Sequence, residues 1–149
     1  MKELRVDSAT SEVVGVVDVL ETWLIAPDRG EQRIAFPEVN AYAGEGFLPN
    51  VTVRIDVPDA PTSLPDSGLV VSDRAMPEAG DVVRRVRLVL SDVSDAVLMQ
   101  MVLTLEAPLG TLSVTCTATD VQWPRLAQAF DDLSASARLE VVAERTASR

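Results

Sequence analysis

Three consecutive segments in the second half of the chain alternate between hydrophobic and polar residues, with the period of two that is typical of β-strands. They span residues 82–91, 97–105 and 111–119. The middle segment also carries Leu98 and Val102 on its otherwise polar face. Short connections with turn residues join the three segments at 92–95 and 107–110, which favours antiparallel hairpins over crossovers. We therefore expect an antiparallel meander whose middle strand is central and partly covered on both faces.

An amphipathic helix is predicted directly after the meander. Apolar residues recur there at helical spacing, namely Trp123, Leu126, Ala127, Phe130, Leu133 and Ala137. Pro124 suits the first turn of a helix and marks its start. Packing this stripe on the apolar face of the meander buries both surfaces. The pattern predicts an α+β domain of two layers, an antiparallel β-sheet packed against a C-terminal helix.

The first half of the chain has a weaker pattern. Strands are predicted at residues 23–26, 32–36 and 50–57. The first two flank the turn sequence 27–30 and form a predicted hairpin. Residues 11–20 fit a helical stripe, but they are also rich in valine, which favours strands; the sequence leaves both structures open. Residues 58–69 contain three prolines and are predicted to form a surface loop.

Size and charge narrow the class of protein. A chain of 149 residues suits one domain, and we expect a single α+β domain over 1–149 with short flexible tails at both ends. The net charge of −10 repels phosphate backbones and anionic lipids, so neither nucleic acid nor a membrane is an expected partner. No apolar run has the length of a signal peptide or a membrane span. We expect a cytoplasmic protein.

The residue inventory argues against catalysis. There is no histidine, and the single cysteine, Cys116, falls on the apolar face of its predicted strand, where a thiol behaves as an inert hydrophobic group. The close acidic pairs lie near predicted strand ends or on a solvated helix face, and no acidic run has the spacing of a calcium loop. We expect no enzymatic activity, no cofactor and no metal.

Six residues are candidates for contact with a partner. They are Tyr42 and Phe47 in a predicted loop, Arg85 and Arg87 on a polar strand face, and the methionines Met99 and Met101. Each pair also has a structural explanation. The aromatic residues would anchor the loop on the core, the arginines would pair across strands with residues such as Asp56 or Glu106, and the methionines would fill the core.

Three local matches give the chain a resemblance to a known fold. They are the sequence FLPNVTV at 47–53 entering a strand, the glycine-led strand 80–90 after the apolar segment 69–72, and a threonine-rich strand that leads into a tryptophan-led helix. With these features the chain resembles the PsbP/DcrB-like fold and, within it, the actinobacterial LpqN-like proteins. Family members usually have a helix after the strand that begins at Pro-Asn. Residues 58–69 are too short and proline-rich for one, so the chain resembles a reduced member without the lipoprotein signal.

The resemblance implies a binding role, because this fold is known mainly for binding and accessory proteins. The prediction is a non-enzymatic adaptor or chaperone-like accessory protein, with a link to secretion among the roles of the fold. Its partner would be another protein or a second copy of the chain, bound on the sheet face or at an exposed edge strand. The alternative is a carrier of a small apolar ligand in a pocket between helix and sheet, lined by residues such as Trp23, Met99, Met101 and Phe130.

Overall fold

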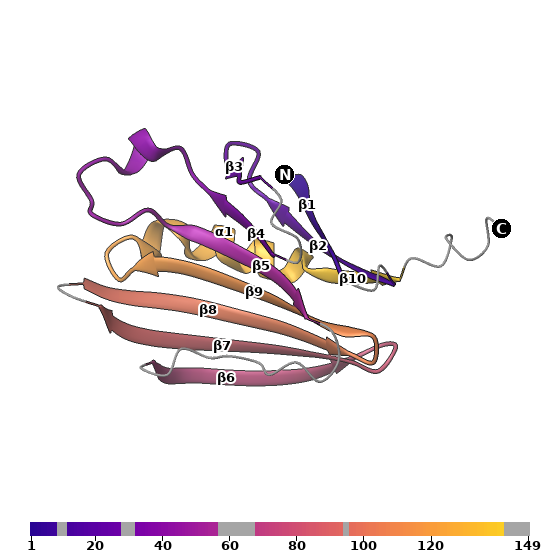
Figure 1. Cartoon of the computed structure of the whole chain (residues 1–149). Coiled ribbons are helices and arrows are strands. Elements are labelled where there is room, and N and C mark those ends of the chain that lie inside the picture. The colour runs from indigo at the N-terminus through magenta and orange to yellow at the C-terminus, as the bar shows by residue number, and fades with distance from the viewer. Residues whose placement is uncertain (9–11, 28–31, 57–67, 94–95, 142–149) are drawn as a thin grey trace.

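The computed structural model describes residues 1–8, 12–27, 32–56, 68–93 and 96–141 (Figure 1). These residues form two antiparallel sheets, one α-helix and one short 3₁₀ helix. The large sheet contains β3 (Leu24–Ile25), β4 (Gln32–Phe36), β5 (Asn50–Asp56), β9 (Gly110–Thr119), β8 (Ala96–Ala107), β7 (Val82–Val93) and β6 (Leu69–Glu78), in that spatial order. The small sheet contains β1 (Lys2–Asp7), β2 (Val13–Val19) and β10 (Arg138–Val141), with β2 in the middle. The helices are η1 (Val39–Tyr42) and α1 (Trp123–Ser136).

The predicted meander and the predicted α+β class are confirmed. β7 pairs with β8 and β8 with β9 in antiparallel register, so that Val86, Leu103 and Val114 lie side by side on one face. We call this face, which carries the hydrophobic core, the inner face. Val102 and Thr104 of β8 are buried on the opposite face, at 7% and 1% exposure, which confirms that the central strand is covered on both sides. α1 follows β9 as predicted and has Pro124 in its first turn.

The N-terminal part of the chain differs from the prediction. Residues 2–7 form β1 instead of a flexible tail, because Leu4 and Val6 are each only 1% exposed and alternate with charged residues. The strand was not predicted because only two apolar residues, Leu4 and Val6, alternate with its charged residues, although both are buried. The open question for residues 11–20 is settled in favour of a strand, β2, which pairs with β1 and β10 on its two sides. The predicted C-terminal tail, beyond Val141, lies outside the described residues.

The predicted loop at 58–69 needs a correction at its end. Residues 57–67 lie outside the described part of the chain, and Leu69 opens the ten-residue strand β6, which pairs with β7. β6 escaped prediction because it lacks an alternating pattern: its apolar residues come first, and Asp73, Arg74 and Pro77 follow. These are residues of an exposed edge strand.

The hydrophobic core lies between the inner face of the large sheet, α1 and the small sheet. Its fully buried members include Val53, Ile55, Leu112 and Val114 of the large sheet and Val17 of the small one. α1 contacts β2, β9 and β8. In Figure 1 the helix lies behind β5 and β9, while β7 and β6 extend below it. Among the described residues no helix has the length and hydropathy needed to cross a bilayer.

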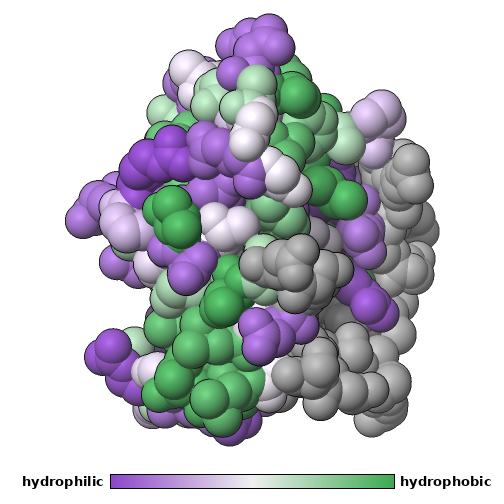
Figure 2. Space-filling model, turned by 90° about the vertical axis from the view of Figure 1, so that its left-hand side faces the viewer, coloured by the Kyte–Doolittle hydropathy of each residue, from purple (hydrophilic) through white to green (hydrophobic). Residues whose placement is uncertain are grey.

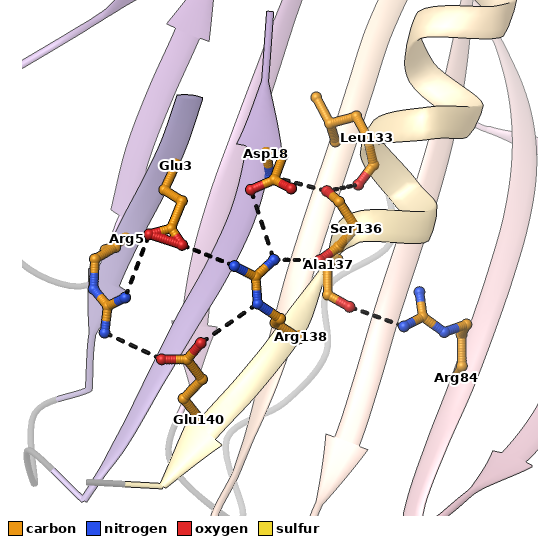
Figure 3. A network of polar contacts seen from close by, with 9 residues as sticks. All are labelled: Glu3, Arg5, Asp18, Arg84, Leu133, Ser136, Ala137, Arg138 and Glu140. Atoms are coloured by element: carbon orange, nitrogen blue, oxygen red, sulfur yellow. Dashed lines mark hydrogen bonds and ion pairs between the residues drawn. The ribbon is translucent and has the colours of Figure 1, made fainter. Parts of the chain in front are cut away.

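A polar network fastens the small sheet to the end of α1 and to β7 (Figure 3). Arg138 of β10 pairs with Glu3 of β1 at 2.8 Å and with Asp18 of β2 at 3.6 Å. On the other side, the guanidinium of Arg84 in β7 donates hydrogen bonds of 2.8 Å each to the carbonyl oxygens of Ser134 and Ala137. Arg138 therefore joins the three strands of the small sheet, and Arg84 joins β7 to the end of α1, from which β10 continues.

Candidate functional site

The inner face of the large sheet is covered unevenly. Along β8, residues 101–105 are buried, whereas residues 96–100 are only half-buried. Across the sheet, burial falls from β9 to β6, because α1 contacts β9 and β8 and the sheet continues beyond them to β7 and β6. We call this uncovered region the open face. Its side chains, which share the inner side by their register, are Leu69, Ser72, Arg74, Met76, Leu88, Leu90 and Met99.

The open face continues an exposed hydrophobic area. Leu69 and Met76, on the open-face side of β6, are 65% and 55% exposed, whereas Val71 at the register shift and Val70 on the opposite side are 51% and 44% exposed. Figure 2, which views the molecule from the left-hand side of Figure 1, shows a continuous hydrophobic area in its lower part, at the height where Figure 1 draws β6, β7 and β8. Contiguous apolar areas of this kind usually mark an interaction surface.

A groove separates the open face from α1. We call it the helix–sheet groove; it has a volume of about 230 Å³. Met101, Leu88 and Val86 form its floor, and Trp123, Ala127 and Asp131 line it from the helix. Ser72 and Arg74 of β6 also line it. The groove therefore combines an apolar floor with one positively and one negatively charged side chain.

The edge of the sheet beside this groove is protected. β6 is an outer strand of the large sheet, and its unpaired backbone could in principle accept another strand. The register shifts between Val70 and Ser72, which marks a β-bulge, and Asp73, Arg74 and Pro77 follow. Bulges, charges and proline are the features that prevent edge-to-edge pairing. A partner is therefore more easily placed on the open face than along the edge.

The six residues predicted as partner contacts fall in three separate places. Met99 and Met101 lie on the inner side of β8, Arg85 and Arg87 lie on the opposite side of the sheet in β7, and Tyr42 and Phe47 lie in the segment that runs from η1 toward β5. The structure brings only the two methionines to the groove and the open face. Met101 lines the groove itself, and Met99 pairs with Leu90 beside it.

The segment with Tyr42 and Phe47 is fastened to the beginning of α1. The guanidinium of Arg125 lies 5.2 Å from the centre of the Tyr42 ring, and Gln122 Nε2 donates a 2.8 Å hydrogen bond to the Phe47 carbonyl oxygen. Glu45 accepts a hydrogen bond from Arg125, which holds the pKa of its carboxyl below the ordinary value. These contacts attach the segment to α1 through the Tyr42 ring and the Phe47 backbone, and a role of the two side chains in partner contact stays a prediction.

Arg85 and Arg87 differ in their surroundings. Arg85 donates two hydrogen bonds, of 2.9 and 2.8 Å, to the carboxylate of Asp73 in β6. Its partner is thus Asp73, where the sequence suggested Asp56 or Glu106; Asp73 was overlooked because β6 was not predicted as a strand. Arg87 is 8% exposed, and its Nε has no hydrogen-bond partner in the described part of the chain.

The ion pair between Arg85 and Asp73 should affect the titration of the Asp73 carboxylate. The hydrogen bonds from Arg85, and after them its positive charge, hold the pKa of Asp73 below the ordinary value of 3.8. Because the pKa is lowered by folding, the stabilisation is complete above the unfolded value and is lost as the pH falls through the folded one. We expect Arg85→Gln to raise the Asp73 pKa toward 3.8 in an NMR titration. Arg5→Gln is the control. An Asp73 pKa unchanged by Arg85→Gln would contradict the assignment.

The described residues offer little chemistry. Cys116 is 1% exposed, and burial raises the pKa of its thiol far above the physiological range, which keeps it protonated. No group of three or more metal-binding side chains gathers within the described ranges. The absence of enzymatic activity stays a prediction.

The open face was only partly visible in the sequence. Met99 and Met101 were identified, but Leu69, Leu88 and Trp123 were assigned to a loop, a strand face and a helix anchor. One signal was available in the sequence. The apolar run 69–71 lies between a proline-rich segment and a charged one, so neither neighbouring segment continues it into a buried face, and this indicates an exposed apolar segment. That the helix leaves Leu88 and Leu90 of β7 and the strand β6 without full cover depends on tertiary packing and has no local sequence signal.

The described residues have an α+β architecture similar to that of the PsbP and LpqN structures, as the resemblance predicted. The LpqN structure, from a protein involved in cell envelope biogenesis of Mycobacterium tuberculosis, is similar to this chain with a TM-score of 0.67 and 12% identity over 93% of this chain and 90% of that one. The solution structure of the cyanobacterial PsbP (CyanoP) of Synechocystis sp. PCC 6803 is similar with a TM-score of 0.61 and 12% identity over 93% of this chain and 92% of that one. The crystal structure of a Bacteroides thetaiotaomicron protein is similar with a TM-score of 0.56 and 10% identity over 97% of this chain and 50% of that one. No family model and no curated protein matches the chain.

Proposed function

We propose that this chain is a non-enzymatic, protein-binding accessory protein, an adaptor or chaperone-like protein, that holds an apolar segment of a partner polypeptide on its open face. The loss of burial from β9 to β6 carries the proposal, since a sheet face with Leu88, Leu90 and Met99 needs a covering layer. The partner segment would supply that layer. The location in the cytoplasm and the link to secretion stay predictions of the sequence.

The chemistry of the groove supports a polypeptide as the occupant. Methionine is unbranched and polarisable, so Met76, Met99 and Met101 can adapt to the side chains of different apolar segments. Arg74 and Asp131, which line the groove, can each pair with a charge that flanks such a segment. The protected β6 edge directs the segment onto the face instead of into the sheet.

The alternative function, a carrier with a pocket between helix and sheet, has weaker support at the predicted place. The groove volume of about 230 Å³ is below the roughly 300 to 1,000 Å³ of typical ligand pockets. Trp23 and Phe130, which were predicted to line the pocket, are 4% and 1% exposed and belong to the core. A polypeptide that extends beyond the groove over the open face fits better.

Two aspartate substitutions on the same strand test the proposal. Leu88 is on the open face and lines the groove, whereas Val83 is on the opposite side of β7 and 37% exposed. The tagged protein is purified from native cells, and the amount of partner that co-purifies is measured. We expect Leu88→Asp to lower this amount at least about tenfold, which corresponds to roughly 1.4 kcal/mol of binding free energy. The reason is that a buried unpaired charge opposes binding. Val83→Asp should retain the partner.

Thermal unfolding of both variants shows whether the fold is kept. Equal partner retention by a folded Leu88→Asp would contradict the proposal, as would a wild-type protein that purifies as a monomer and retains nothing. Self-association of the wild type that Leu88→Asp abolishes would identify a second copy of the chain as the occupant of the open face.

A further inference from the structure

A second pocket, which we call the end pocket, lies at the other end of the large sheet. Its lining comes from Val13 of β2, Val82 of β7, Ala107 and Leu109 of the β8–β9 hairpin, and Leu139 and Val141 of β10. Along β8 it is six residues away from the groove residue Met101, which corresponds to about 20 Å. It is therefore distinct from the helix–sheet groove and touches none of the residues that line it.

The end pocket lies between residues of the small sheet and residues of the large sheet. The 2.8 Å hydrogen bond from Arg84 to the Ala137 carbonyl oxygen ties β7 to the end of α1 (Figure 3). Beyond it, Val82 precedes Arg84 by two residues and Leu139 follows Ala137 by two. From there β10 pairs with β2 only, while β7 and β8 continue toward their own hairpin turns. Strands of both sheets therefore contribute to the lining of the pocket.

The lining specifies the chemistry of a ligand. Every residue that lines the end pocket in the described part of the chain is apolar. A charged or strongly polar group placed inside would lose its water without gaining a hydrogen-bonding side chain. The volume of about 340 Å³ is more than twice that of the roughly 150 Å³ apolar cavity that accepts benzene in another protein. Leu109 and Val141 stand at the mouth with 41% and 61% exposure, so an apolar ligand would also cover hydrophobic side chains that now face water.

From this lining, volume and rim we propose that the end pocket binds an uncharged aliphatic group, a hydrocarbon tail of medium length whose polar end stays in solvent. The site goes beyond the proposed protein-binding role, since it uses a different surface and a different class of ligand. The tail could belong to a free molecule or be attached to a polypeptide, and the shared chemistry is the hydrocarbon.

The test uses N-phenyl-1-naphthylamine, an uncharged dye that fluoresces in apolar surroundings, with the full-length protein. We expect the dye to bind and decanol to displace it, whereas decanedioate, with a charge at each end, should not. Ala107→Trp fills the end pocket and Ala127→Trp fills the helix–sheet groove. The first should weaken dye binding at least tenfold and the second less than twofold. Decanol and an N-decanoyl peptide, compared as competitors, distinguish a free tail from an attached one.

A second variant keeps the test valid if Ala107→Trp does not fold. Leu109→Glu changes an exposed rim residue and should weaken dye binding at least fivefold, because a carboxylate then stands at the mouth. The inference is overturned if the wild-type protein binds no dye, if decanol fails to displace it, or if a folded Ala107→Trp binds it as the wild type does. Loss of binding in Ala127→Trp alone would move the apolar ligand to the groove.

Discussion

Phe130→Ala is expected to destabilise the protein by about 3 to 5 kcal/mol, the range for truncating a buried phenylalanine. Phe130 is 1% exposed. Its ring packs edge-on against Trp23, with centroids 6.3 Å apart, and tilted against Trp123 at 5.3 Å. It therefore joins α1 to Trp23, which lies between β2 and β3, and packs within the helix on Trp123, while its side chain belongs to the hydrophobic core. Urea denaturation followed by tryptophan fluorescence measures the loss of free energy of unfolding. The dependence of this free energy on urea concentration, the m-value, should be unchanged if unfolding stays two-state.

Val121→Ala is the matched truncation for this measurement. Val121 is 77% exposed just before α1, and its loss should change the free energy of unfolding by less than about 0.5 kcal/mol. A similar small change in Phe130→Ala would mean that the helix does not depend on this aromatic contact, and the packing of α1 described above would be wrong.

Arg84→Met is expected to cost about 2 to 4 kcal/mol, because it removes charge-assisted hydrogen bonds to two carbonyl groups at the helix end. The Arg84 side chain is only 14% exposed, and it also donates a 2.7 Å hydrogen bond to Glu78. Methionine keeps the length of the side chain but leaves the Ser134 and Ala137 carbonyl oxygens without this donor. Hydrogen exchange should show faster opening of β10 and of the last turn of α1.

Arg74→Met, the same substitution on the neighbouring strand, is the control for Arg84. Arg74 is exposed, and exposed charges contribute little to stability, so we expect a change of less than about 0.5 kcal/mol. Equal effects of the two substitutions would show that Arg84 does not join β7 to the end of α1.

The sequence predicted the part of the fold that depends on regular periodicity. The strands 82–91, 97–105 and 111–119 and the helix near Pro124 were found because each buries one regular face. β1, β6 and β10 were missed for different physical reasons. β1 hides two buried residues among charges, β10 has four residues, and β6 is an edge strand that is exposed along most of its length, so burial leaves no alternating pattern in its sequence.

The candidate site could be predicted only in fragments. Met99 and Met101 were chosen for their adaptability, and the structure places Met99 on the open face and Met101 in the helix–sheet groove. Arg85 and Arg87 lie on the side of β7 opposite Leu88, as their alternation with Leu88 implies, and partner contact by them stays a prediction. The open face itself arises because α1 is too narrow to cover all the strands, and this depends on the order of strands in space, which no single segment encodes.

The central claim is that a partner polypeptide lies on the open face, and crosslinking from two adjacent residues of β8 tests it most directly. Met99 is on the inner side of β8, paired with Leu90, and Gln100 is on the opposite side, where it donates a hydrogen bond to Thr117. A photoreactive amino acid is placed at one position or the other in native cells. We expect a crosslinked partner from position 99 and not from position 100. Crosslinks of equal yield from both, or from position 100 alone, would contradict the account.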